Sequence, residues 1–149
     1  MAKRFPLQTL LDLSQVRLDE AARLLGQLLA SEQADETKLG MLVAYREEYH
    51  ARFRETACNG MGHDTFQNFS SFLSRLDEAI AQQRTTVLAA KQRTAEGQKA
   101  WADERTRVKA FDTLSQRHQQ RELALESKRE QRLTDEHAAK RFRAGGATR

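Results

Sequence analysis

The residues with the most obvious chemical potential are His50, Cys58 and His63, which lie close together near the middle of the sequence, followed by Asp64. Imidazole, thiolate and carboxylate groups are the side chains that ligate zinc, and a structural zinc site uses four of them. Asp64 is the only nearby candidate for the fourth ligand. Cys58 has no cationic neighbour in sequence that would activate its thiol. We therefore expect solvated side chains and a passive thiol, with no metal site.

Motifs that support catalysis are missing from the sequence. It contains no Walker-type phosphate loop, no GxGxxG, no HExxH and no paired CxxC. The single cysteine leaves no internal disulfide and is typical of a reducing compartment. We expect a protein that is not an enzyme and that needs no cofactor.

The elements that position these side chains must be long helices. The chain has one proline and seven glycines in 149 residues, whereas an all-β or doubly wound fold needs a turn about every ten residues. Turn-forming residues concentrate at 57–64. The sequence therefore predicts an all-α fold of two long helices, over about 8–56 and 65–142, forming an antiparallel coiled-coil hairpin. We expect one rod-like domain over 1–149, with a frayed tail at 143–149.

No apolar run approaches the roughly 18 residues of a membrane span, and the first residues lack the apolar centre of a signal peptide. We expect a soluble protein that is not secreted by that route.

A heptad pattern predicts how the two helices pair. Nine of fourteen a and d positions are apolar when the first heptad begins at Leu11, with a polar interruption at Glu32 and Asp35. A second apolar seam begins at Phe66, and a sustained 3-4 spacing is typical of helices that touch one or two neighbours. Antiparallel pairing across the turn places residues whose numbers sum to about 121 opposite each other. Leu25 should then face Gly97, Phe53 should meet Phe69, and residues after about 110 should have no partner from the first helix.

The positions that flank the seam differ on its two sides. On one side, Tyr45 and Phe72 lie beside Lys38 and Ala79, bordered by the seam residues Leu42, Tyr49 and Leu76. The other side offers His50, Ser70, Asp77 and Arg84, with Val43 its only apolar member. Two helices alone cannot cover the flanking aromatic rings, and exposed apolar surface commonly marks a partner site. The alternative is that these rings only widen the intramolecular core.

Basic residues are most frequent in the last third of the chain, where residues 101–149 carry 12 Lys and Arg against 8 Asp and Glu. Lys128-Arg129 and the run 140–143 could contact phosphates or anionic lipid. Interspersed acids such as Glu126 and Glu130 would weaken that field. A structural coiled-coil adaptor and a basic nucleic-acid-binding helix therefore remain alternative functions.

Four segments of the sequence resemble the flagellar type III export protein FliJ family, and size and order match as well. They are 19–26 (DEAARLLG), 38–49 (KLGMLVAYREEY), the Asn59-Gly60 turn, and 69–80 (FSSFLSRLDEAI).

This resemblance implies a non-enzymatic, cytoplasmic component of the bacterial flagellar export apparatus, peripheral at the cytoplasmic face of the inner membrane. It implies an antiparallel coiled coil similar to the central stalk of rotary ATP synthases. The implied partners are the hexameric export ATPase FliI, the export gate protein FlhA and substrate chaperones. ATPase-binding residues cannot be assigned, and Lys38 and Gln83 depart from the Gln and His that the family often shows. The gate-binding patch of the family would fall on Leu42, Tyr45, Tyr49, Phe72, Leu76 and Ala79.

Overall fold

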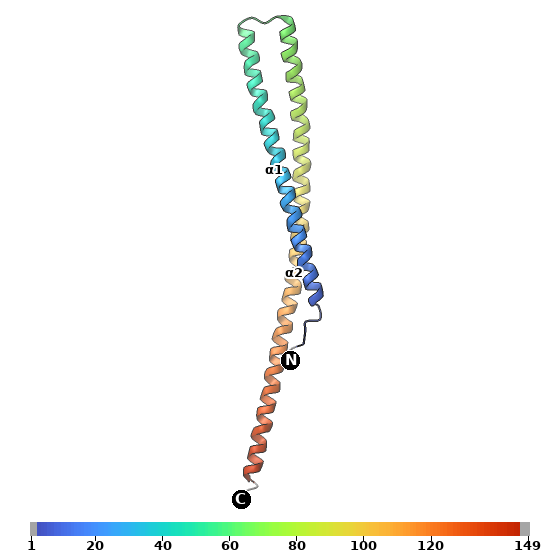
Figure 1. Cartoon of the computed structure of the whole chain (residues 1–149), viewed down its shortest axis with the longest axis vertical. Coiled ribbons are helices and arrows are strands. Elements are labelled where there is room, and N and C mark those ends of the chain that lie inside the picture. Colours follow the sequence, from blue (N-terminus) through green and yellow to red (C-terminus); the bar gives the residue numbers. More distant parts are fainter. Residues whose placement is uncertain (1–2, 147–149) are drawn as a thin grey trace. The chain divides into compact units, whose positions relative to one another are not determined.

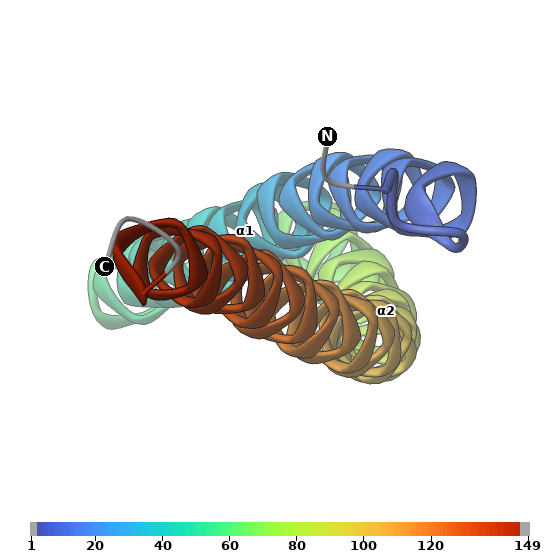
Figure 2. The same cartoon turned by 90° about the horizontal axis from the view of Figure 1, so that it is seen from below.

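The fold consists of two helices joined by one turn (Figures 1 and 2). A computed structural model describes residues 3–146. Helix α1 spans Gln8–Cys58 and helix α2 spans His63–Gly146, and these two helices are the only regular elements of the described chain. The predicted fold class is confirmed, because two long helices pack against each other as a hairpin and the second is longer. Neither helix holds an apolar stretch long enough to span a bilayer, within residues 3–146.

The turn is shorter than the segment 57–64 expected from composition. Helix α1 continues to Cys58, and the amides of Asn59 and Gly60 bond back to the carbonyls of Glu55 and Ala57 at 3.2 and 3.3 Å. Gly60 has φ of 94°, which a residue without Cβ adopts at little cost. The chain can therefore reverse within four residues.

At its other end α2 continues to Gly146. Residues 143–146, expected to belong to a frayed tail, are helical, and the rest of that tail lies outside the described residues.

The described chain divides into two compact units, which are considered separately. The hairpin unit comprises residues 20–102 and includes the turn. The terminal unit comprises residues 3–19 and 103–146.

The core of the hairpin unit is a single seam between the helices. Its buried apolar side chains are Leu76, Ile80, Val87 and Ala90, all at predicted heptad positions. None of the described side chains is both large and fully buried. A pair of helices covers one stripe of each and leaves the flanks partly in water.

Contacts across the seam confirm the predicted antiparallel register. The Phe53 and Phe69 ring centroids lie 5.4 Å apart. A Cβ built on Gly97 would lie 3.7 Å from Leu25 Cδ1 and only 2.6 Å from Leu28 Cδ1. The absence of a side chain at Gly97 therefore lets these two leucines approach the backbone of α2.

The polar interruption predicted in the first seam is matched by polar groups on α2. Gln83 Nε2 donates to the Asp35 backbone carbonyl at 2.9 Å, and Lys91 pairs with Glu36 at 3.4 Å. Gln83 is buried but hydrogen-bonded, which removes most of the cost of placing an amide in the seam.

In the terminal unit, residues before α1 pack on α2. The Phe5 and His118 rings lie 5.6 Å apart, and His118 Nε2 donates to the Lys3 carbonyl at 2.9 Å. The Lys3 amide also donates to Glu122 at 3.4 Å. The expected limit near residue 110 concerns helix α1 only. The non-helical residues before α1 contact α2 past that limit, as far as Glu122. Every described residue from 127 onward is exposed.

Polar side chains also occupy the seam positions of the terminal unit. Ser14 and Ser115 are buried there. Glu104 pairs through Oε1 with Arg107 at 3.3 Å, but its Oε2 is buried and accepts no hydrogen bond in the described structure. Leaving a carboxylate oxygen unsatisfied in a seam costs free energy of folding.

Gly26 and Gly97 lie in different surroundings, so replacing each by leucine should change the free energy of unfolding in opposite directions. Gly26→Leu should raise the free energy of unfolding by about 1 kcal/mol, because nothing lies within 4 Å of its Cβ position and leucine is the better helix former. Gly97→Leu should lower it by about 1–3 kcal/mol through overpacking against Leu28. Urea unfolding followed by circular dichroism measures both. Equal effects at the two positions would contradict the close approach at Gly97.

Removing the unsatisfied carboxylate should stabilise the terminal unit. Glu104→Leu is expected to increase the free energy of unfolding by about 1–2 kcal/mol, since it replaces an orphaned polar atom in the seam with apolar surface. Thermal unfolding provides the measurement. The matched control is Glu96→Leu at an exposed position of α2, where the change should stay within about 0.5 kcal/mol.

Candidate functional site: an aromatic flank near the turn

Three aromatic side chains of the predicted patch lie together in the hairpin unit. Tyr49 on α1 packs against Phe72 on α2 with ring centroids 4.5 Å apart. Tyr45 meets Phe72 edge to face with ring centroids 6.1 Å apart, and it lies 6.3 Å from Tyr49 with the two rings tilted. The edge-to-face contact places the positive edge of one ring near the negative face of the other. The helix spacing of four residues between the tyrosines puts both on the same side of α1.

The aromatic cluster continues toward the turn. Tyr49 also contacts Phe69 at 5.1 Å, and Phe53 lies between Phe69 and Phe66, with the latter at 5.7 Å. These contacts cross from one helix to the other. These ring contacts, which lie between the patch and the turn, restrict the movement of the rings in the predicted patch.

Members of the predicted patch differ in how much surface they offer. Tyr45 is 44% exposed, whereas Leu76 is only 7% exposed and belongs to the core. Leu42, Tyr49, Phe72 and Ala79 are half-buried. Phe72 is thus partly accessible, whereas Leu76 lies in the seam beneath the exposed residues of the patch.

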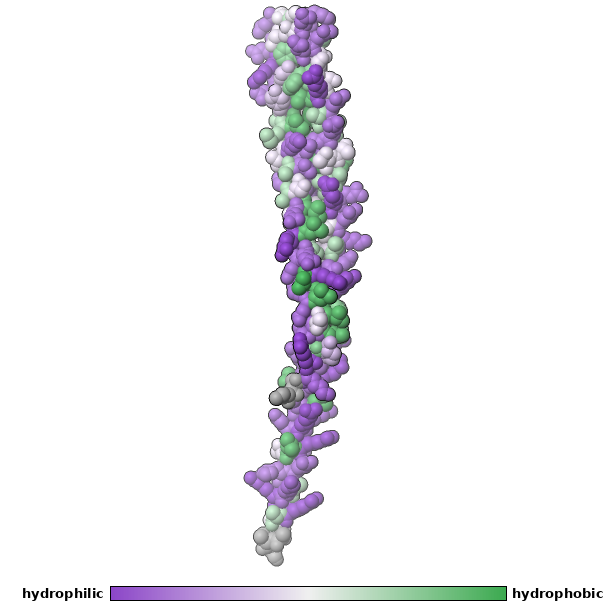
Figure 3. All heavy atoms as spheres, turned by 45° about the vertical axis from the view of Figure 1, so that its right-hand side comes forward, coloured by the Kyte–Doolittle hydropathy of each residue, from purple (hydrophilic) through white to green (hydrophobic). Residues whose placement is uncertain are grey.

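A shallow groove on α1 adds a residue that the heptad pattern does not indicate. Met41 is 68% exposed and lines this groove together with Leu42 and Tyr45, with Lys38 and Glu48 also at its wall. Its signal in the sequence was a long apolar side chain outside the heptad seam. On the face that Figure 3 presents, hydrophobic residues of the hairpin unit also gather just below the turn. The apolar flank therefore includes the outer surface of α1.

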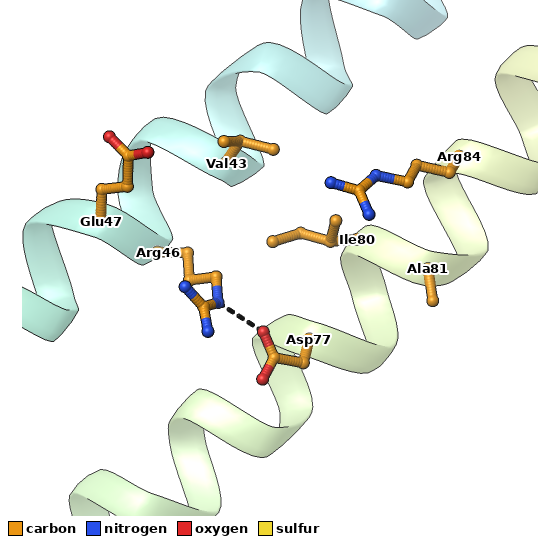
Figure 4. A pocket seen from close by; sticks show the side chains of 7 residues that line it. All are labelled: Val43, Arg46, Glu47, Asp77, Ile80, Ala81 and Arg84. Atoms are coloured by element: carbon orange, nitrogen blue, oxygen red, sulfur yellow. Dashed lines mark hydrogen bonds and ion pairs between the residues drawn. The ribbon is translucent and has the colours of Figure 1, made fainter.

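The opposite flank of the hairpin unit is polar, as the sequence predicted. Arg46 of α1 forms an ion pair with Asp77 of α2, and both line a hollow with Val43 and Ile80 (Figure 4). Arg84 extends from α2 toward α1 in the same view. An exposed pair of this kind contributes little stability, so this side lacks the apolar anchors of the aromatic flank.

The potential metal ligands are not brought together. Within residues 3–146, no three His, Cys, Asp or Glu side chains are grouped so that they could hold a metal ion. Cys58 is exposed at the end of α1.

The fold and the site together define the class of this protein, an antiparallel two-helix coiled coil with a partly exposed aromatic flank. The sequence profile of the family described as flagellar FliJ protein matches residues 3–147. The flagellar FliJ protein of Salmonella typhi is 33% identical over 138 residues, which cover 93% of this chain and 94% of that protein. The flagellar FliJ protein of Escherichia coli (strain K12) is 30% identical over the same shares of both chains. The chain belongs to the FliJ family of flagellar export proteins.

Stability measurements should distinguish the patch residues that stabilise the fold from those that mainly provide exposed surface. Leu76→Ala should lower the free energy of unfolding by about 2–3 kcal/mol, because it removes buried methyl groups from the seam. Tyr45→Ala should cost about 1 kcal/mol or less, since nearly half of the side chain is already in water. Urea unfolding of both variants provides the comparison. If Tyr45→Ala lowered the free energy of unfolding as much as Leu76→Ala does, the Tyr45 ring would be a stabilising part of the fold.

Proposed function

We propose that this protein is a non-enzymatic coupling subunit of the bacterial flagellar type III export apparatus. In this role it binds the hexameric export ATPase FliI as a central stalk, connects it to the export gate protein FlhA and escorts substrate chaperones. It would act in the cytoplasm, peripherally at the inner membrane. The observation that carries the proposal is the partly exposed cluster of Tyr45, Tyr49 and Phe72 in a chain of the FliJ family.

The aromatic flank has the properties of a protein-binding surface. Tyr45 and Phe72 are fixed by ring contacts across the seam, so little side-chain entropy remains to be lost on binding. Large rigid rings in a partner's pocket carry much of the affinity of protein interfaces. Lys38 and Glu48 at the neighbouring groove place charges at the rim, where they affect association rate more than affinity. We propose the gate as the occupant of this surface.

A stalk function needs no catalytic residue in this chain. A two-helix coiled coil has no rotational symmetry that matches six subunits, so each subunit of a surrounding ring meets a different surface. Contacts of different free energy would bias the nucleotide states of individual subunits. A ring that closes around the coiled coil would also be stabilised by mass action.

Truncating the aromatic flank should weaken gate binding and leave the fold intact. Phe72→Ala or Tyr45→Ala should reduce affinity for the cytoplasmic region of FlhA by about tenfold to thirtyfold, the loss typical of an interface hot spot. Isothermal titration calorimetry measures the affinity, circular dichroism the helicity, and swimming assays the motility. Leu88→Ala removes an apolar side chain elsewhere on α2 that is more exposed, at 67%, than either ring, and it should bind normally. Normal gate binding and motility with both rings removed would refute this part of the proposal.

The stalk function is distinguished from a purely structural adaptor by its effect on ATP hydrolysis. Adding this chain to the purified export ATPase should raise ATP turnover and the hexamer fraction, because a ring bound to the chain is favoured by mass action. A phosphate-release assay and analytical ultracentrifugation provide the measurements. Unchanged turnover together with unchanged assembly would favour the adaptor.

A further inference from the structure

The last turns of α2 carry an exposed aromatic ring among cations. In the sequence, Phe142 follows Lys140 and Arg141 and precedes Arg143. No acidic residue follows Glu136. Phe142 is 85% exposed, more than any other large apolar side chain of the described residues. Removing such a ring from water by contact with a partner makes the free energy of binding more favourable.

Helix geometry places this ring on an uncharged face. Residues three and four positions away from Phe142 share its side of the helix, and they are alanines 138 and 139 and glycines 145 and 146. Arg141 and Arg143 project about 100° to either side of the ring. Their long side chains can lie along an apolar boundary while the guanidinium groups stay at its polar edge. The end of α2 therefore combines a smooth apolar face with flanking cations.

We infer that this end of α2 binds the surface of a membrane that contains anionic lipids. Phe142 enters the boundary between headgroups and acyl chains, and Arg141 and Arg143 contact lipid phosphates. A bilayer buries the ring and the small residues beside it at the same time as it neutralises the cations. A nucleic-acid backbone would use the cations and leave most of the apolar face in water. The observed combination thus favours lipid over nucleic acid.

The preceding turns of α2 lack this combination. Lys128, Arg129 and Arg132 are as numerous as the cations at the end, but Glu130 lies between them and three more acids flank them, namely Glu126, Asp135 and Glu136. Opposite charges in alternation weaken the attraction to an anionic surface. Figure 3 shows mainly hydrophilic residues along this part of the face that it presents. This segment provides a matched comparison of equal cationic charge on the same helix.

One ring and a few cations produce weak, reversible attachment at the interface. Stable anchoring to a membrane generally requires a second contribution. Lipid binding by this segment would therefore concentrate the protein at the membrane surface and still allow it to dissociate.

Vesicle co-sedimentation of the full-length protein tests the inference. The wild-type protein should bind phosphatidylcholine vesicles that contain phosphatidylglycerol and not vesicles of phosphatidylcholine alone. Joint replacement of Lys140, Arg141 and Arg143 by Gln should reduce partitioning by about a hundredfold, since each basic side chain near an anionic surface contributes roughly a fivefold factor. Phe142→Ala should reduce it by about tenfold. Phe142→Trp should retain binding and show a blue-shifted emission with the anionic vesicles, relative to the wild-type protein with Trp101 alone.

The matched control replaces Lys128, Arg129 and Arg132 by Gln and should bind nearly as the wild type does. Equal losses for the two triple variants would show charge attraction without a site and would overturn the inference. Unchanged binding by Phe142→Ala, or no blue shift for Phe142→Trp, would also overturn it. Tighter binding to duplex DNA than to vesicles at equal phosphate concentration, with no dependence on Phe142, would assign the segment to nucleic acid instead. Circular dichroism verifies that each variant keeps its helices.

Discussion

The structure depends on one constraint, which is that a pair of helices can bury only one stripe of each. Every buried residue of the described chain lies at a heptad position of the seam, and in the hairpin unit the apolar part comprises four side chains on α2. With so few buried groups, each contributes a large share of the stability of the pair. The same constraint leaves the flanks available to partners, because no further layer covers them among the described residues.

Polar residues within the seam have different consequences in the two units. In the hairpin unit, Gln83 bonds to a backbone carbonyl and Thr94 donates to Ala90 and to Leu28, so buried polar atoms are satisfied. Satisfied polar contacts of this kind favour one register over others. In the terminal unit, Glu104 keeps one buried oxygen without a partner. A seam that tolerates such a cost is locally weaker than an apolar one.

The proposed function relies on surfaces rather than on a cavity with reactive groups. The aromatic flank lies beside the seam that holds the helices together, so Tyr49 and Phe72 contribute both to packing and to accessible surface. The polar flank, with the Arg46–Asp77 pair, offers a chemically different side. Two unlike sides allow one coiled coil to discriminate between partners. The basic and aromatic end of α2 adds a third surface with its own chemistry.

Sequence alone determined the helices, the position of the turn, the seam and the antiparallel register, because a heptad period interrupted by one cluster of turn residues permits few arrangements. It also identified the side of the seam on which Tyr45 and Phe72 lie. Only the tertiary structure decided how much surface each patch residue exposes, so that the seam residue Leu76 is covered, Tyr45 remains open and Met41 lines a groove. Periodicity gives the direction of a side chain, but its exposure depends on helix separation and on neighbouring rotamers. The packing of Phe5 on His118 likewise has no local signal, since it joins residues distant in the chain through a segment without helical period.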